Sequence, residues 1–151
     1  MRIKVVRGTG ESYGHNMCMD ALAGLPNVDE VIYPAEIRPI GWHTLGESEA
    51  ICRAALAVED AKGEPWIGVA YSLGALSLGD YVQFDRPRNC RGIVQVADPL
   101  RAAGQVNNRG VANTTWGCAG QRQLTGPWAW YSFAIPDDPI ASCPGDNGFR
   151  Q

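Results

Sequence analysis

The sequence lacks several features, and each absence excludes a class of protein. It has no excess of positive charge, because 13 Lys and Arg stand against 16 Asp and Glu and the formal charge is −3. Such a chain offers no basic field to nucleic acid or to an anionic membrane. No apolar run reaches membrane-spanning length, and the first ten residues, MRIKVVRGTG, are typical of a strand and a turn. We therefore expect no nucleic-acid partner, no transmembrane segment and no signal peptide.

Clusters of metal-binding residues are also missing. The chain has two histidines, and its five cysteines form no C-x-x-C pair. We therefore expect no metal and no cofactor. An odd number of cysteines argues against a disulfide framework, so Cys18 and Cys52 are expected as buried thiols on helix faces. Cys118 and Cys143 lie in Gly- and Pro-rich loops, and whether they pair stays open.

Strand-like and helix-like segments alternate along the chain. Strands are predicted at 2–6, 28–33, 66–71, 92–97 and 128–133, and helices at 15–25, from 44 or 47 to 61, and 73–82. The second helix is expected to bury Ile51, Ala55, Leu56 and Val58. Alternation of this kind predicts an α/β fold with a mostly parallel sheet of five strands between helices. The segment 100–127, rich in Asn, Gly and Gln, is expected to be a loop over the sheet.

Ser72 lies where a predicted strand meets a predicted helix, in WIGVAYSLGALSLGDYV at 66–82. Ala70 and Gly74 flank it in the pattern A-x-S-x-G, which is the layout of a nucleophile elbow. Small neighbours are needed there because the strand and the helix pass close to the serine. Right-handed crossovers bring every loop that follows a strand to one rim of the sheet. The residues expected together on that rim are Thr9, Ser72, Asp98 and Asp138.

Five segments occur along the chain in a characteristic order: VRGTGE, YPAEI, VAYSLGAL, VADPLR and FAIPDDPIAS. In that order they resemble the phage lysin B esterases and, more distantly, the cutinases, which are α/β-hydrolases that cleave lipid esters. The resemblance implies a cutinase-like, three-layer α/β/α core with a flavodoxin-like strand order. It also implies that residues 1–134 form the core and that 135–151 form an acid loop and tail of the same domain.

The resemblance assigns the catalytic roles. Ser72 matches the nucleophile and Asp138 the triad acid, with Asp137 as its competitor. Thr9 and the backbone N–H of Leu73 match the two oxyanion donors. The pattern also departs from the family, most visibly at position 7, where Arg7 stands in place of a histidine that the lysins typically carry.

The base of the triad is missing from its family position. No histidine follows Asp138 in the printed sequence, so the resemblance implies a C-terminally truncated form. His43 and His15 both follow early strands, and each is either a substitute base or an ordinary loop histidine. In the rim loops, Trp42 and Trp116 are the candidates for contact with substrate or partner.

Two other predictions concern residues near the rim. Trp128 and Trp130 share one face of the last strand and are expected in the core. Asp98 and Arg101 are expected to form a local ion pair that holds the rim.

Two functions remain open. The absent base slightly favours a virion-associated structural protein, such as a minor tail protein, that keeps the fold and has little or no activity. Its partners would be other virion proteins or further copies of itself, and it would be found in the virion or, before assembly, in the host cytoplasm. The alternative is an active serine esterase that acts on mycolyl or similar envelope lipid esters, with a lipid ester as its ligand.

Overall fold

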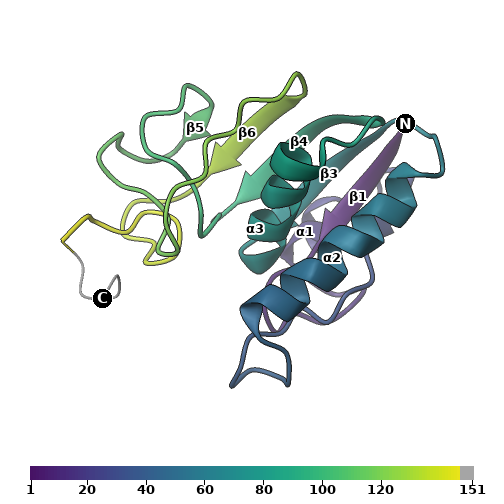
Figure 1. Cartoon of the computed structure of the whole chain (residues 1–151), viewed down its shortest axis with the longest axis horizontal. Coiled ribbons are helices and arrows are strands. Elements are labelled where there is room, and N and C mark those ends of the chain that lie inside the picture. Colours follow the sequence, from purple (N-terminus) through teal and green to yellow (C-terminus); the bar gives the residue numbers. More distant parts are fainter. Residues whose placement is uncertain (147–151) are drawn as a thin grey trace.

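The chain folds into a single sheet with helices on both faces (Figure 1). The structure, a computed structural model, describes residues 1–146. The strands are β1 Arg2–Val6, β2 Val28–Glu30, β3 Trp66–Tyr71, β4 Cys90–Val96, β5 Asn108–Arg109 and β6 Ala129–Phe133. The helices are α1 Met17–Ala21, α2 Leu45–Asp60 and α3 Leu73–Asp80, and α3 continues into a π-helical turn, η1 Tyr81–Asp85.

The sheet has six strands in the order β2-β1-β3-β4-β6-β5, and each of these pairings is parallel. The expected number of five was wrong because β5 lies in the segment predicted as a loop. It has two residues and pairs only with β6 at the edge of the sheet. A strand so short carries no periodic signal. The five strands that the sequence predicts lie in the flavodoxin-like order β2-β1-β3-β4-β6.

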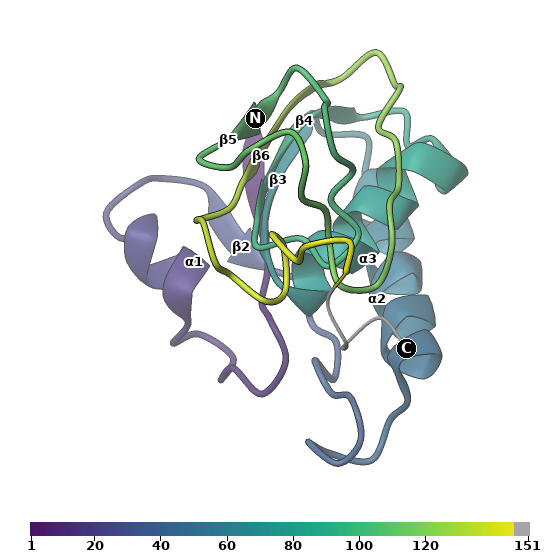
Figure 2. The ribbon, with the colours of Figure 1, turned by 90° about the vertical axis from the view of Figure 1, so that its left-hand side faces the viewer.

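The main core lies between the sheet and the α2–α3 layer, whereas α1 lies on the opposite face (Figure 2). Alternate residues of each strand face the α2–α3 layer. Gly68 of β3 is one of them, and a Cβ at this position would lie 2.6 Å from the Leu78 side chain. Trp128 and Trp130 are buried in this core, as predicted. Within residues 1–146, no helix is both long and apolar enough to cross a membrane.

The buried face of α2 differs from the predicted one. The helix buries Ser48, Cys52 and Leu56, while Ile51 and Val58 are 40% and 62% exposed. Leu56 is buried as predicted, and Ala55 packs against the core. Ser48 and Cys52 occupy the rest of the buried face, where α2 packs against α3, and Ile51 and Val58 face outward.

The first helix is shorter than predicted. It spans Met17–Ala21 instead of 15–25, and the Asn16 side chain caps it by accepting a hydrogen bond from the Met19 N–H. Gly24 has a φ of 87° and ends the segment, and Pro26 follows it. This short helix covers only part of its face of the sheet.

Candidate active site at the carboxyl edge of the sheet

Ser72 occupies a sharp turn between β3 and α3. Its φ and ψ are 51° and −117°, a combination that residues with a Cβ rarely adopt. Its N–H donates to the Val96 carbonyl of β4 at 2.9 Å, and its carbonyl accepts from the Leu76 N–H at 3.0 Å. Both sides of the turn are therefore fixed, and the strain, of order 1–3 kcal/mol, is held by the surrounding structure.

Two glycines let the elbow form. A Cβ on Gly74 would lie 2.2 Å from the Val6 carbonyl oxygen, so the start of α3 passes directly against the end of β1. A Cβ on Gly8 would lie 3.2 Å from the Ser72 Cβ and 2.7 Å from the Tyr71 ring. The turn after β1 and the elbow after β3 are therefore in contact, as the predicted rim requires.

The turn after β1 presents Thr9 beside the serine. Gly8 N–H donates to the Glu11 carboxylate at 2.7 Å, and Gly10 N–H donates to the Ala35 carbonyl at 2.9 Å. Between them, the Thr9 N–H has no hydrogen-bond partner among residues 1–146, and the same is true of the Leu73 N–H at the start of α3. Two amides without a partner in residues 1–146 thus lie in the two turns that meet at Ser72, at the positive end of the α3 dipole.

Arg7 fixes this turn, a role that sequence reasoning did not find. Its side chain is buried and donates to the Glu11 carbonyl at 3.0 Å and to the Tyr33 carbonyl at 2.6 Å. Its guanidinium carbon also lies 5.3 Å from the centre of the Tyr33 ring, and the Tyr33 hydroxyl donates back to the Arg7 carbonyl. Arg7 therefore ties the turn after β1 to the loop after β2.

Asp138 lies in the loop after β6 and is half-buried. One carboxylate oxygen accepts the Ile140 N–H at 2.9 Å, and its carbonyl accepts the Ser142 N–H at 2.9 Å. Asp137, the competing candidate, is exposed and has a φ of 65°. Asp138 is thus the better anchored of the two carboxylates.

Arg101 contacts the loop that carries Asp138. An ion pair between Arg101 and Asp98 was predicted, and it does not form. Its Nε donates to the Ala141 carbonyl at 2.6 Å, and its Nη2 donates to the Thr115 carbonyl at 2.8 Å. Burial lowers the pKa of its guanidinium, and the charges of Asp98 and Asp138 oppose that shift. The predicted ion pair was wrong because the Arg101 side chain is directed toward the acid loop.

The partner of Asp98 is Arg122, from the long segment between β4 and β6. Arg122 Nη2 lies 2.6 Å from the Asp98 carboxylate, and its Nη1 lies 2.9 Å from Asp80 at the end of α3. All three side chains are buried. This network holds the segment that covers the rim against α3.

The imidazoles lie apart from the triad residues. His43 Nδ1 is 2.5 Å from the Glu36 carboxylate, which also accepts the Trp42 N–H at 2.9 Å. The hydrogen bond from His43, followed by that from Trp42, holds the pKa of Glu36 below its ordinary value. His15 is an exposed turn residue. Within residues 1–146, neither imidazole is hydrogen-bonded to Ser72 or to Asp138.

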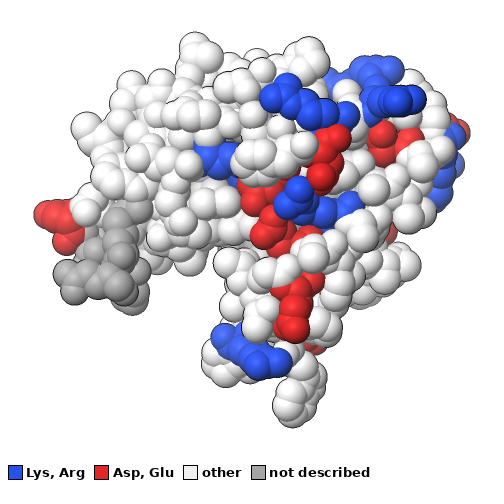
Figure 3. Space-filling model, viewed as in Figure 1, with Lys and Arg blue, Asp and Glu red and all other residues white. Residues whose placement is uncertain are grey.

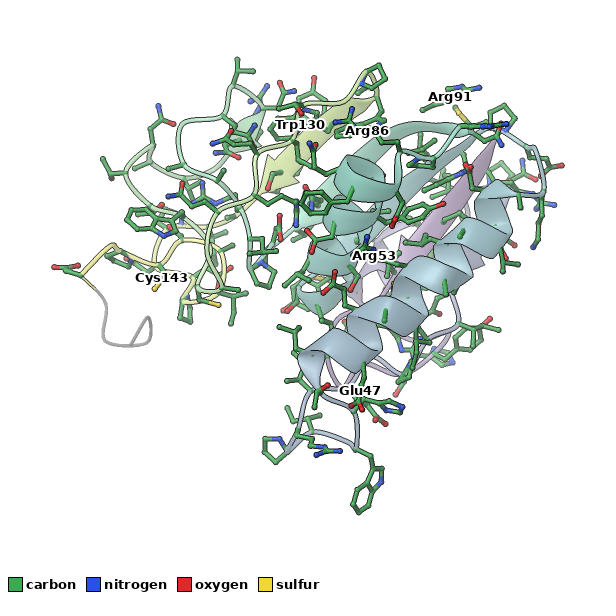
Figure 4. The ribbon with its side chains drawn as sticks, in the orientation of Figure 1. Glu47, Arg53, Arg86, Arg91, Trp130 and Cys143 are labelled. Carbon is green, nitrogen blue, oxygen red and sulfur yellow. The ribbon has the colours of Figure 1, made fainter. Side chains whose placement is uncertain are left out.

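The two candidate tryptophans have different settings. Trp42 is 84% exposed in the loop between β2 and α2, which projects from the molecule near the start of α2 where Figure 4 labels Glu47. Trp116 is half-buried and packs beside Gly145, where a Cβ would lie 2.6 Å from its ring. Figure 3 shows the surface hollowed between this projecting loop and the lobe formed by the segments after β4 and β6.

The fold is similar to that of solved cutinase-like α/β-hydrolases. No protein-family model matches the chain, and no curated protein sequence matches it. An iodinated complex of an acetyl xylan esterase has a TM-score of 0.72 and 19% identity, with 99% of this chain and 89% of that chain covered. A cutinase-like protein from Cryptococcus sp. has a TM-score of 0.72 and 18% identity, with 98% and 83% covered. Lysin B from Mycobacteriophage D29 has a TM-score of 0.75 and 19% identity, with 96% and 68% covered.

Proposed function

We propose that this protein is a serine hydrolase that cleaves esters, with Ser72 as the nucleophile. The observation that carries the proposal is the backbone of Ser72, at φ 51° and ψ −117°. Such a conformation costs about 1–3 kcal/mol and is typical of sites where strain serves the chemistry. A fold that used this turn only as a connection would gain nothing from a serine there, because glycine would relieve the strain.

In this proposal each residue of the rim has a separate catalytic role. Ser72 Oγ attacks the ester carbonyl carbon, and the backbone N–H groups of Thr9 and Leu73 bind the oxyanion that forms. Gly8 and Gly74 supply the clearance that keeps these groups adjacent. Asp138 orients the imidazole that takes the serine proton and stabilises its charged form.

Proton removal sets the expected rate. His43 is the one imidazole in residues 1–146 that already has a carboxylate partner, Glu36, and its Nε2 makes no hydrogen bond there. Without a base within reach of Ser72, the oxyanion donors alone leave a rate of about 10³-fold over water. We therefore propose slow turnover for this chain alone, and faster turnover where an imidazole reaches both Ser72 and Asp138.

The likeness in fold to solved esterases supports an ester as the substrate. An acetyl xylan esterase and a cutinase-like protein share the fold, and so does lysin B of a mycobacteriophage. We propose an ester with an apolar acyl chain, such as a mycolyl or related envelope lipid ester. The indole of Trp42, which is 84% exposed in the loop between β2 and α2, supports an apolar substrate.

Hydrolysis of p-nitrophenyl butyrate tests this function. We expect slow release of p-nitrophenol that Ser72→Ala abolishes and Asp138→Asn reduces. His43→Ala reduces the rate only if His43 supplies the base, and His15→Ala reduces it only if His15 does. The proposal is overturned if Ser72→Ala releases p-nitrophenol as fast as the native chain. It is also overturned if the native chain is folded and releases no p-nitrophenol.

One observation favours a second function. Because neither imidazole of residues 1–146 is bonded to Ser72 or Asp138, the scaffold can serve without chemistry as a virion-associated structural protein, such as a minor tail protein. Mass spectrometry of purified phage particles tests this role. Recovery of the chain at fixed stoichiometry supports it, and recovery only in the soluble lysate contradicts it.

A further inference from the structure

One face of the sheet is left partly uncovered. Strand alternation places Ile67, Val94, Val96, Tyr131 and Phe133 on the side away from α2 and α3, as the cross-strand register shows. On this side α1 contacts β1 and β3, and Figure 2 shows it near the β1–β2 end of the sheet. Over β4 and β6, Tyr131 and Phe133 therefore remain 44% and 43% exposed.

Such exposure is unusual for a parallel sheet. Parallel sheets occur almost only with both faces covered, because their strands are apolar on both sides. Here the strip runs across β4 and β6, with the half-buried Val94 beside Tyr131 and the half-buried Val96 beside Phe133. Val96 also packs against the buried cluster of Ala97, Ala134 and Ala141. We name this strip, formed by Ile67, Val94, Val96, Tyr131 and Phe133, the open face.

The open face contains a small hollow over Gly92, which we call the socket. Gly92 has no side chain, and a hollow of about 160 Å³ lies over it, between Ile67, Val94 and Tyr131. A Cβ on Gly92 would lie 2.8 Å from the Ala129 carbonyl oxygen. A larger residue at position 92 would therefore clash with the backbone of β6 and could not easily fill the hollow. A side chain from outside is needed to fill it.

The charges around the open face have one sign. Arg91 lines the hollow at the start of β4, where Figure 4 labels it, and its guanidinium bonds only to the Arg88 and Cys90 carbonyls. At the other end, the Arg109 guanidinium lies 5.0 Å from the centre of the Tyr131 ring. Neither arginine has an ion pair within residues 1–146, and no Asp or Glu occupies this face of β3, β4 or β6.

We infer that the open face binds an amphipathic α-helix of a partner protein, with an apolar stripe that carries acidic residues at both ends. Helices are the elements that cover parallel sheets, and acidic groups complement the two arginines. A second copy of this chain fits poorly, because a two-fold interface would bring the arginines of both copies to one apolar surface. The proposal does not depend on Ser72 or on any hydrolysis.

The register gives the size of the partner helix. The Arg109 guanidinium lies over the Tyr131 ring, and Tyr131 is level with Val94, three residues along β4 from Arg91. Three residues of strand span about 10 Å. An α-helix covers that distance in about seven residues, or two turns. The partner helix should thus carry its two acidic residues about seven positions apart, with a large apolar residue between them for the socket over Gly92.

Designed peptides test this inference by fluorescence anisotropy. The probe is an amphipathic helix of about 18 residues, long enough to be helical in water, with two Glu about seven positions apart beside a Leu stripe. A second peptide has Lys at those two positions. We expect the Glu peptide to bind at least about tenfold more tightly than the Lys peptide. We also expect Phe133→Glu to abolish binding, whereas Phe84→Glu, a matched exposed phenylalanine of η1, does not change it.

A charge exchange keeps the test independent of folding defects. The double variant Arg91→Glu/Arg109→Glu should prefer the Lys peptide, and Arg86→Glu, which changes an arginine outside the open face, should keep the native preference. Equal binding of the two peptides, or binding of neither, overturns the inference. So does a dimer in sedimentation velocity that Phe133→Glu dissociates, because the occupant would then be a second copy.

Discussion

Replacing Ser72 by glycine should stabilise the protein relative to replacing it by alanine. At φ 51°, both serine and alanine hold a strained backbone, and glycine does not. Relief of the strain contributes about 1–3 kcal/mol. Glycine also increases the entropy of the unfolded chain, which costs about 0.4–1 kcal/mol. Ser72→Gly should therefore be more stable than Ser72→Ala by about 1 kcal/mol, or about 2–4 °C in Tm for a chain of this size.

The assay is urea unfolding of both variants, followed by tryptophan fluorescence. Ser12 provides the matched control, because it is exposed and does not have a positive φ. At that position the order should be reversed, with Ser12→Gly less stable than Ser12→Ala. If glycine is the less stable residue at both positions, Ser72 is not strained and the argument for a catalytic elbow fails.

Three further predictions concern the packing around the elbow. Gly74→Ala should unfold the protein or lower its stability by at least about 3 kcal/mol in urea, because its Cβ would clash with the backbone of β1. Arg122→Leu should cost about 3–5 kcal/mol in the same assay, since it leaves the buried carboxylates of Asp98 and Asp80 unpaired. Burial, followed by a hydrogen bond to Asp80, raises the pKa of Glu49 above its ordinary value of 4.5. Protonated Glu49 therefore stabilises the fold at low pH. This contribution to the free energy of unfolding is lost as the pH rises through the raised pKa. Glu49→Gln should therefore flatten the fall in unfolding free energy measured between about pH 4 and pH 7, and an unchanged slope would contradict this assignment.

The parts of the fold that carry a local signal could be predicted from the sequence. The elbow is such a part, because an apolar strand, Ser72 and a small-residue helix follow one another without interruption. The start of α2 is another, since Thr44 and Glu47 form a capping box with reciprocal hydrogen bonds. Elements whose signal depends on partners were missed. β5 exists only through its pairing with β6, and the buried face of α2 is chosen by α3.

The candidate site divides in the same way. The turn that carries Thr9 lies beside the elbow because strand order and crossover handedness bring it to the same rim, and both rules can be applied to a sequence. Leu73 follows Ser72 directly in the chain. The supporting contact of Arg7 could not be found, because Arg7 and Tyr33 belong to loops that are far apart in the chain. The contact between Glu36 and His43 lies within one irregular loop, where no periodic pattern indicates it. Only the folded rim shows that Arg7 holds the turn after β1.

The most direct test of the account is the reaction of the protein with a fluorophosphonate, followed by intact mass and peptide mapping. The account predicts a single adduct on Ser72, lost in Ser72→Ala and slowed in Gly8→Ala, whose Cβ would press on the serine. No adduct on the folded chain, or adducts spread over several serines, would contradict a nucleophile held beside an oxyanion pocket.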